Sequence, residues 1–154
     1  MDSGKQFDLA SKWLKGDESA VALLFILGDI SQVWDDLIDR DKPVSNLDIN
    51  RMMMLSLIDL NKNSFFVRHH TELTTILDVQ IQSWIDSNFL EQTKDPHFIH
   101  VAFGLRSVLT PVFLHMVGMI GGMDWRMQAM KEIYPAVYDE PFENYLKEHA
   151  NGVY

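Results

Sequence analysis

Residues 17–40 read Asp17-Glu-Ser-Ala-Val-Ala-Leu-Leu-Phe-Ile-Leu-Gly-Asp-Ile-Ser-Gln-Val-Trp-Asp-Asp-Leu-Ile-Asp-Arg40 and show the helical pattern of this chain most clearly. Apolar residues recur every three to four positions on one side, at Ile26, Leu27, Ile30, Val33, Trp34, Leu37 and Ile38. This spacing is typical of an amphipathic helix. Asp17 or Ser19 precedes the apolar run and is a suitable N-cap. The stretch therefore predicts one long helix that ends near Arg40.

The same spacing continues through the rest of the chain and predicts further helices. The first covers about residues 5–15 and stops at Gly16. After Pro43, the pair Ser45 and Asp48 resembles a capping box that opens a third helix. The other predicted boundaries are a break at Asn61-Lys62-Asn63, a helix over 64–90, a helix from Asp95-Pro96 to about Ile120 kinked near Pro111, a stop at Gly121-Gly122, a short helix from Asp124 to Pro135, and a last helix from Glu140-Pro141 to Asn151-Gly152.

These elements define the expected fold class. Regular two-residue alternation, the mark of a strand, is hard to find, and no internal repeat or long linker divides the chain. Connections of a few residues favour antiparallel neighbours. We therefore predict an all-α protein: one domain, residues 1–154, forming a bundle of about six or seven mostly antiparallel helices.

Composition excludes several classes of function. The chain has 154 residues, 47% of them hydrophobic, and a formal net charge of −9, so its surface repels nucleic acid and anionic lipid. Cysteine is absent and the segment Met1–Lys5 lacks the pattern of a secretory signal, which predicts a cytoplasmic protein. Residues 107–123 are the most apolar segment, but they are shorter than the ~20 apolar residues that cross a bilayer. We interpret them as a buried core helix.

The segment with chemical character is an acidic cluster on the helix of residues 17–40. At ~100° per residue, Asp29, Asp35, Asp36 and Asp39 fall within one arc of that helix. Asp35 and Asp39 are one turn apart, and their like charges repel unless a cation intervenes. Carboxylates are ligands that Mg²⁺ prefers. The cluster therefore predicts a Mg²⁺ site.

A solvated face is the competing interpretation, because any amphipathic surface helix carries acids opposite its apolar stripe. Residues 20–27, however, are apolar all round, which predicts that they are covered on every side. Phe25 shares the arc of Asp29 and Asp36. The acidic face is therefore expected to continue a buried face and to look into a cleft.

The segment Ala22-Leu-Leu-Phe-Ile-Leu-Gly-Asp-Ile-Ser-Gln-Val-Trp-Asp-Asp-Leu-Ile-Asp-Arg-Asp-Lys-Pro43 resembles the first aspartate-rich motif of the class I isoprenoid synthases, particularly the trans-prenyl diphosphate synthases. In that all-helical family, D-D-x-x-D ends an apolar helix, and its aspartates bind Mg²⁺ that bridges the diphosphate of an allylic substrate. The resemblance implies that Asp35, Asp36 and Asp39 are metal ligands, with Lys42 in the basic turn that follows.

The resemblance is confined to residues 22–43. The second aspartate-rich motif of the family has no counterpart in Asp78, Asp86 and Glu91. This implies a reduced relative, or a homodimer in which a second copy closes the site. Further cations that we expect to bind the diphosphate are Arg51, Arg68 and Arg106.

Other functions were weighed from the residues. His97 and His100 could share a helix face, but no E-x-x-H or H-E-x-x-H pattern supports a zinc or di-iron site. Helical nucleoside triphosphate pyrophosphatases use paired glutamates that are missing here. The competing class is a non-catalytic interaction protein with a solvated aspartate face. Its surface would carry the C-terminal aromatics Trp125, Tyr134, Tyr138, Tyr145 and Tyr154, and a requirement for Mg²⁺ would separate the two classes.

Overall fold

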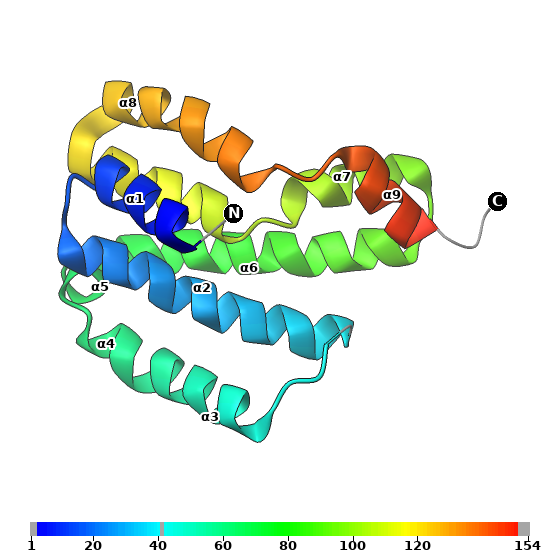
Figure 1. The fold of residues 1–154 in the computed structure, drawn as a ribbon, viewed down its shortest axis with the longest axis horizontal. Helices are drawn as coiled ribbons and strands as arrows, with labels where there is room; N and C mark the ends of the chain where they lie inside the picture. The colour runs from blue at the N-terminus through cyan, green and yellow to red at the C-terminus, as the bar shows by residue number, and fades with distance from the viewer. Residues whose placement is uncertain (1–2, 41, 151–154) are drawn as a thin grey trace. The chain divides into compact units, whose positions relative to one another are not determined.

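The computed structural model describes residues 3–40 and 42–150, and every regular element in these ranges is a helix, which confirms the all-α prediction (Figure 1). The chain divides into two compact units, Asp2–Leu73 and Thr74–Tyr154. We call them the N-terminal unit and the C-terminal unit. The acidic cluster lies in the N-terminal unit.

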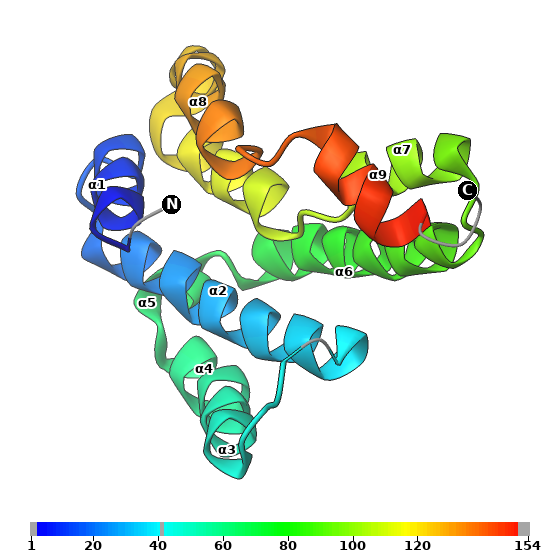
Figure 2. The ribbon, with the colours of Figure 1, turned by 45° about the vertical axis from the view of Figure 1, so that its right-hand side comes forward.

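The N-terminal unit is built around one long helix, α2, against which α1, α3, η1 and α5 pack (Figure 2). Its elements are α1 (Ser3–Trp13), α2 (Glu18–Asp39), α3 (Asn46–Met54), the π-helix η1 (Leu55–Asp59), α4 (Leu60–Lys62), α5 (Ser64–Arg68) and the start of α6 (His70–Gln92). The elements α3, η1 and α4 follow one another without a gap, so residues 46–62 form a single rod beside α2 (Figures 1 and 2).

Local signals set the helix ends of this unit as predicted. Gly16 has a positive φ of 70°, which ends the turn after α1. The carboxylate of Asp17 caps α2 by accepting from the backbone N–H of Ala20 at 3.0 Å. Ser45 and Asp48 form the complete capping box of α3, with each side chain accepting from the other residue's backbone N–H.

Asp17 is also the basis of a testable pH dependence. Burial alone would raise its pKa, but hydrogen bonds from Ser19 and Ala20, together with Arg68, outweigh burial, so the pKa of Asp17 lies below its ordinary value of 3.8. A lowered pKa stabilises the fold above the ordinary value, and this stabilisation is lost as pH falls through the lowered pKa.

We expect Asp17→Ala to cost about 1 kcal/mol of unfolding free energy at neutral pH, the usual loss for an N-cap. The difference from wild type should narrow below about pH 4, where the wild-type carboxylate becomes protonated. Urea unfolding followed by circular dichroism between pH 7 and pH 3 measures it, with Asp8→Ala on the exposed side of α1 as control. A difference that stays constant over this range would contradict the assigned role of the charge.

The predicted helix over 64–90 is interrupted. Of the predicted break at Asn61-Lys62-Asn63, only Asn63 is confirmed, because α4 continues to Lys62. The Asn63 side chain accepts from the N–H of Phe66 and donates to the carbonyl of Ser19. A second break at His69, with φ −116° and ψ 25°, separates α5 from α6. The sequence next to His69 has no glycine or proline that would predict this break. Phe65 and Phe66 are adjacent and both buried, so tertiary packing of this turn decides its position.

The C-terminal unit contains α6 from Thr74 onward, α7 (Pro96–Leu105), α8 (Leu109–Val137) and α9 (Phe142–Ala150). Asp95 caps α7 by accepting from the N–H of His97, as predicted. The helices α7 and α9 pack together (Figure 2). Their shared core consists of Ile99, Tyr145 and Ala150, flanked by Phe103, Phe142 and Leu146.

Two predicted boundaries in this unit are wrong. The helix that begins at Pro96 ends at Leu105 instead of running to Ile120, and α8 starts afresh at Leu109. Pro111 therefore lies in the first turn of α8, where its missing N–H has no acceptor to lose, and it causes no kink. Pro135 does not end its helix, because α8 continues to Val137. At that position the proline removes one backbone donor from the last turn only.

The predicted stop at Gly121-Gly122 is a kink inside α8. Gly122 has φ 81° and ψ 179°, a conformation open to glycine, and the helix axis changes there. A Cβ on Gly121 would lie 2.1 Å from Cδ1 of Trp125, so the kink also needs a residue without a side chain at 121. The last helix, α9, begins at Phe142, next to the predicted start; its predicted end at Asn151-Gly152 lies outside the described residues.

Within the described residues, the stretch Pro96–Val137 is long and apolar enough to cross a membrane by length and composition alone. A core helix of a soluble protein passes the same test. In the first half of α8 the buried residues are Thr110, Val112, Phe113, Leu114, Met116 and Val117, and 39% of the most apolar 18-residue window is buried. This burial supports the interpretation of residues 107–123 as a core helix.

Candidate functional site

The acidic cluster lies on the C-terminal half of α2, beside α3. The carboxylate of Asp29 accepts from the guanidinium of Arg51 on α3, with Nη2 and Oδ2 2.9 Å apart. One turn further along, Gln32 donates from Nε2 to Oδ1 of Asp36 at 3.0 Å. The polar face of α2, as we call Asp29, Gln32, Asp36 and Asp39, therefore carries linked polar contacts over most of its length.

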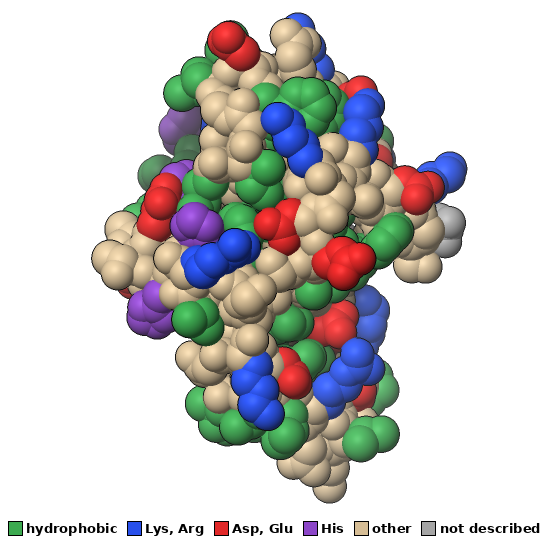
Figure 3. Space-filling model, turned by 90° about the vertical axis from the view of Figure 1, so that its left-hand side faces the viewer, with side chains coloured by type: hydrophobic (Ala, Val, Ile, Leu, Met, Phe, Trp, Pro, Cys, Tyr) green, Lys and Arg blue, Asp and Glu red, His purple; other side chains and the backbone are tan. Residues whose placement is uncertain are grey.

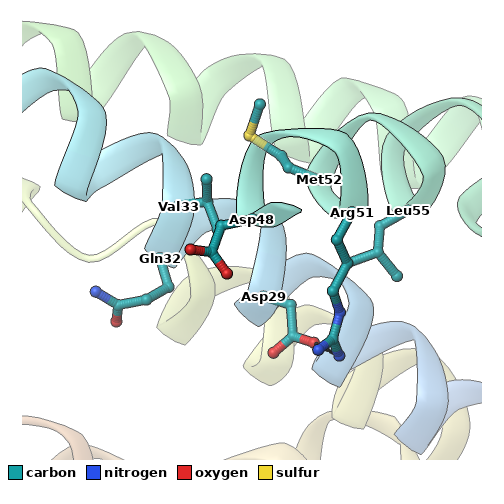
Figure 4. A pocket seen from close by; sticks show the side chains of 7 residues that line it. All are labelled: Asp29, Gln32, Val33, Asp48, Arg51, Met52 and Leu55. Atoms are coloured by element: carbon teal, nitrogen blue, oxygen red, sulfur yellow. Dashed lines mark hydrogen bonds and ion pairs between the residues drawn. The ribbon is translucent and has the colours of Figure 1, made fainter. Parts of the chain in front are cut away.

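A pocket of about 200 Å³ opens where this face meets the rod of residues 46–62. Its lining consists of Asp29, Gln32 and Val33 from α2, and Asp48, Arg51, Met52 and Leu55 from the rod (Figure 4). Figure 4 shows the side chains of Asp29 and Arg51 meeting at the pocket. The pocket thus has the Asp29–Arg51 ion pair and a separate carboxylate, Asp48, in its lining, together with the apolar side chains of Val33, Met52 and Leu55.

Asp36 is the most enclosed of the aspartates whose contacts are resolved, with a side chain 18% exposed. Besides the amide of Gln32, it faces the ammonium of Lys42, with Nζ and Oδ1 3.8 Å apart. Lys42 is the cation that the resemblance placed in the basic turn, and it lies against the central aspartate of the motif. The role of this lysine in binding a ligand stays a prediction.

Asp35 is half-buried and Asp39 is exposed, and none of the three predicted metal ligands, Asp35, Asp36 and Asp39, is among the residues that line the pocket. In residues 3–40 and 42–150 no three His, Asp or Glu side chains are grouped closely enough to hold a metal ion by themselves, so Asp35, Asp36 and Asp39 do not converge on one point. Asp41, which ends the acidic string, lies outside the described residues. Asp35 and Asp36 are successive positions, so their side chains leave the helix in different directions, whereas Asp35 and Asp39 are one turn apart.

The pocket does not lie where the cleft was expected, next to Phe25 and the aspartates. Phe25 is half-buried and its ring lies 6.2 Å from the ring of Phe7 on α1, so it lines no cleft next to the aspartates. The segment 20–27 is not covered on every side, because Ala22 is exposed. The pocket opens instead on the α3 side of α2. The reason is the rod of residues 46–62, whose place beside α2 the sequence pattern did not predict.

Of the four predicted cations, two lie at the polar face and two elsewhere. Arg68 faces Asp17 at the start of α2, with Nη2 and Oδ2 3.7 Å apart. Arg106 belongs to the C-terminal unit, where it donates to Glu140 at 2.8 Å and stacks over the ring of Tyr145. The structure thus gathers Arg51 and Lys42 at the aspartates and gives Arg68 and Arg106 other partners.

The surroundings of Asp48 favour the ionised form of its carboxylate. The hydroxyl and the backbone N–H of Ser45 both donate to Asp48, and with the charge of Arg51 they hold the pKa of Asp48 below its usual value of 3.8. Negative charge on Asp48 therefore persists into mildly acidic solution. The charge of the pocket therefore favours a cationic ligand, or an anionic ligand that binds together with a metal ion.

The donor set can be tested against the predicted Mg²⁺. Aspartate oxygens are hard ligands of the kind that this ion prefers, and it commonly takes one or two of them while phosphate oxygens and waters complete the octahedron. The polar face could supply at most two carboxylate ligands to one ion. The residues therefore fit a Mg²⁺ ion that is held jointly with a phosphate ligand, and they do not fit a closed site made by protein alone.

Residue-by-residue reasoning missed the pocket lining on α3. Asp48 was predicted only as a cap, and no role was predicted for Gln32 or Leu55. One local signal existed: Asp48, Arg51, Met52 and Leu55 recur at helical spacing and so share one side of the rod. That this side turns toward Asp29 depends on how α3 packs.

The structure also shows where the candidate histidines and the C-terminal aromatic residues lie. The ring of His100 stacks on Phe142 at 3.7 Å and His97 is exposed, as expected of core-edge and surface histidines. Among the aromatics proposed for an interaction surface, Tyr134 is exposed, but Tyr145 is only 1% exposed and that prediction is wrong. Tyr145 fills the core between α7 and α9. Tyr154 lies outside the described residues.

No protein-family model matches the chain, and neither the curated proteins nor the solved structures contain a significant match to it.

Proposed function

We propose that the polar face of α2 and the adjoining pocket bind a diphosphate-bearing ligand in a Mg²⁺-dependent manner. One observation carries the proposal: two of the cations predicted to bind the diphosphate, Arg51 and Lys42, are ion-paired with Asp29 and Asp36 of this face. Carboxylates and cations thus lie next to one another on this face, which supports the proposal. Carboxylates would hold Mg²⁺, and the two cations would bind phosphate oxygens.

When a ligand binds to this face, new ion pairs with the metal and the phosphate would replace the existing ion pairs, so no charge would be left without a partner. In the free protein the aspartates neutralise Arg51 and Lys42. When the carboxylates turn to Mg²⁺, the phosphate oxygens replace them as partners of the cations. Because Mg²⁺ alone would leave the cations without partners, and phosphate alone would repel the aspartates, we expect metal and phosphate to bind together.

The volume of the pocket bounds the ligand. Pockets for drug-sized ligands are typically ~300–1,000 Å³, whereas this one is about 200 Å³. It accommodates the diphosphate end of a ligand, and a longer group would extend beyond it. The resemblance of residues 22–43 to the isoprenoid synthases makes a prenyl chain our leading choice for that group, and turnover of the bound diphosphate, with Mg²⁺ stabilising the leaving pyrophosphate, is the activity proposed with it.

The test is thermal unfolding with millimolar Mg²⁺ and pyrophosphate together, and with each alone. At a hundred times its dissociation constant a ligand adds about 2.7 kcal/mol, which is a shift of several degrees in the melting temperature. We expect this shift in wild type only when both components are present. Asp36→Asn and Arg51→Gln should abolish it, whereas Asp8→Asn, on α1, should retain it.

The double variant Asp35→Asn/Asp39→Asn tests the predicted metal ligands that lie outside the pocket. Loss of the shift would support their role in holding the ion. If wild type shows no shift and this variant is more stable than wild type, relief of like-charge repulsion is the explanation, and the aspartates are a solvated face.

The alternative, a non-catalytic interaction protein, is favoured by a different observation. Large apolar side chains are exposed in both units, and hydrophobic groups reach the surface in the view of Figure 3. Such side chains gathered on one element mark interaction sites. Unlike the diphosphate proposal, this function needs no Mg²⁺, so the same unfolding experiment separates the two.

A further inference from the structure

The second half of α8, residues 123–137, is held in the C-terminal unit by one side. The chain turns back at Gly122, and this half returns along the first half of α8 (Figure 1). Cδ of Arg126 lies 3.3 Å from the position that a Cβ on Gly118 would take, and Ala129 and Ile133 are fully buried. These contacts fix the inner side of the helix in the core.

The solvent side of residues 123–137 carries a continuous line of large apolar side chains. We call this line the α8 stripe; it consists of Met123, Met127, Met130, Tyr134 and Val137, which are all exposed. Their spacings of four, three, four and three residues keep them within about 80° of the helix surface at ~100° per residue. Two paired helices contact each other with this alternation of three and four. The stripe therefore has the pattern of a surface that another helix covers.

Two opposite charges border the α8 stripe on the side away from the core. Asp124 and Lys131 are exposed, and each lies about 80–100° from the middle of the stripe. The buried residues Ala129 and Ile133 lie along the other border. Lys131 donates to the neighbouring Gln128, and within the described ranges neither charge forms an ion pair with this chain. Both charges are therefore available to the partner that covers the stripe.

An antiparallel second copy of the helix matches both the stripe and its charges. With Met127 of each copy opposite Met130 of the other, the two stripes are in register. The same register brings Asp124 of each copy beside Lys131 of the other. Two ion pairs would therefore flank the apolar contact on its solvent side, as charges beside the seam of paired helices commonly do.

Other partners match these charges less well. In a parallel copy each stripe residue would lie opposite itself, and residues five positions apart on the two borders would meet across the seam. Arg126 and Lys131 have this spacing, so two cations would be brought together. A uniformly acidic or uniformly basic partner helix would match only one of Asp124 and Lys131. Charge complementarity thus favours a second, antiparallel copy.

We propose that the α8 stripe is the interface of a homodimer, in which residues 123–137 of two copies pack antiparallel about a twofold axis level with Gln128 and Ala129. Such an interface is self-complementary, because each copy contributes the same apolar side chains and both signs of charge. The proposal goes beyond diphosphate binding and does not depend on it, since the stripe belongs to the C-terminal unit and the pocket to the N-terminal unit.

The size of the interface sets the expected strength. Stable complexes bury about 800 Å² on each partner, whereas residues 123–137 extend only ~22 Å at ~1.5 Å per residue and would bury one face. We therefore expect a dimer that dissociates on dilution through the micromolar range. Sedimentation velocity of the full chain should show the change from twice the mass of the chain to the mass of the chain. A single species with the mass of one chain, up to the highest concentration tested, would overturn the proposal.

Met127→Glu tests the apolar stripe. Its side chain is 51% exposed, so the monomer should keep its helicity, while a charge placed in the interface should weaken association by at least about tenfold. The matched control is Val79→Glu, which adds the same charge on α6 of the same unit, at a position that is also 51% exposed. Equal dissociation constants for the two variants would overturn the assignment of the interface.

Asp124→Lys and Lys131→Asp test the ion pairs. Each variant alone places like charges together in its own homodimer, so we expect association about three- to tenfold weaker than that of wild type. A mixture of the two variants restores opposite charges at both pairs, because one copy then carries two lysines and the other two aspartates. The mixture should therefore associate more tightly than either variant alone, with circular dichroism confirming that the helix is retained. A mixture that associates no better would contradict the charge pairing and with it the choice of a second copy.

Single-cysteine variants test the direction of the two helices, since the chain has no cysteine of its own. In the antiparallel register Met123 lies opposite Tyr134 of the other copy, so Met123→Cys mixed with Tyr134→Cys should join through a short thiol-reactive cross-linker. In either variant alone the two thiols would be roughly 16 Å apart along the helices at ~1.5 Å per residue, and they should not join. Cross-linking of each variant with itself would indicate a parallel pair and overturn the arrangement.

Discussion

Replacing Tyr145 by alanine is expected to lower the free energy of unfolding by about 3–5 kcal/mol, the usual cost of removing a buried aromatic ring. The side chain is 1% exposed, and it belongs to the core that α7 and α9 share. Its ring lies 5.1 Å from the ring of Phe103, and the guanidinium of Arg106 covers it at 4.4 Å. Alanine would leave a cavity that these neighbours cannot fill without moving.

The hydroxyl of Tyr145 can be separated from its ring. It donates to Oε1 of Glu91 on α6, a half-buried carboxylate that also faces His149. Tyr145→Phe keeps the ring and removes the donor, so we expect a smaller loss of about 1.5–3 kcal/mol, the range for a hydrogen bond to a charged group. Tyr134→Ala is the matched control, since that tyrosine is 41% exposed.

Urea unfolding followed by far-ultraviolet circular dichroism measures the series. The expected order of destabilisation is Tyr145→Ala, then Tyr145→Phe, then Tyr134→Ala. If Tyr134→Ala is as destabilising as Tyr145→Ala, the packing described for the α7–α9 core is wrong.

Phe65→Ala should have an effect of the same size in the N-terminal unit, about 3–5 kcal/mol. Phe65 is 2% exposed on α5, which packs against α2, and its ring lies 4.6 Å from that of His69 at the break before α6. Removing the ring takes away a contact that holds α5 in place. Val67→Ala, two residues further along the same helix, should cost less than about 1 kcal/mol, because Val67 is exposed.

Phe65→Ala and Tyr145→Ala together also test the prediction of a single domain. Each lies in a different compact unit. One domain predicts that either substitution shifts the unfolding of the whole chain as one cooperative transition. Two resolved transitions, each sensitive to only one of the substitutions, would show instead that the units unfold separately.

The helix ends that could be predicted are those set by neighbouring residues. Asp17, the Ser45–Asp48 pair, Asn63 and Asp95 each satisfy a backbone donor two or three residues away. The kink at Gly122 likewise depends on the conformational freedom of one residue. These interactions span less than one helical turn, so the sequence pattern contains all that is needed to recognise them.

The boundaries that were missed depend on packing. The break at His69 has no glycine or proline, and residues 106–108 separate α7 from α8 inside an apolar run. Pro135 is the opposite case: a proline is a strong local signal for the end of a helix, but α8 continues past it. Burial of apolar side chains by distant elements is worth more than the propensity of one residue, so it decides such cases.

For the candidate site, the sequence by itself determined that one helix carries the aspartates, because helical spacing alone places Asp29, Asp36 and Asp39 on one side. Only the tertiary structure decided which cations join them. Arg51 reaches Asp29 across 22 positions of sequence, while Arg106 lies in the other unit. Spacing along a helix is a property of the backbone, so it can be read from the sequence. Contact between two helices depends on which of their faces bury apolar surface together. That choice is made by the fold as a whole and cannot be read from the spacing of residues.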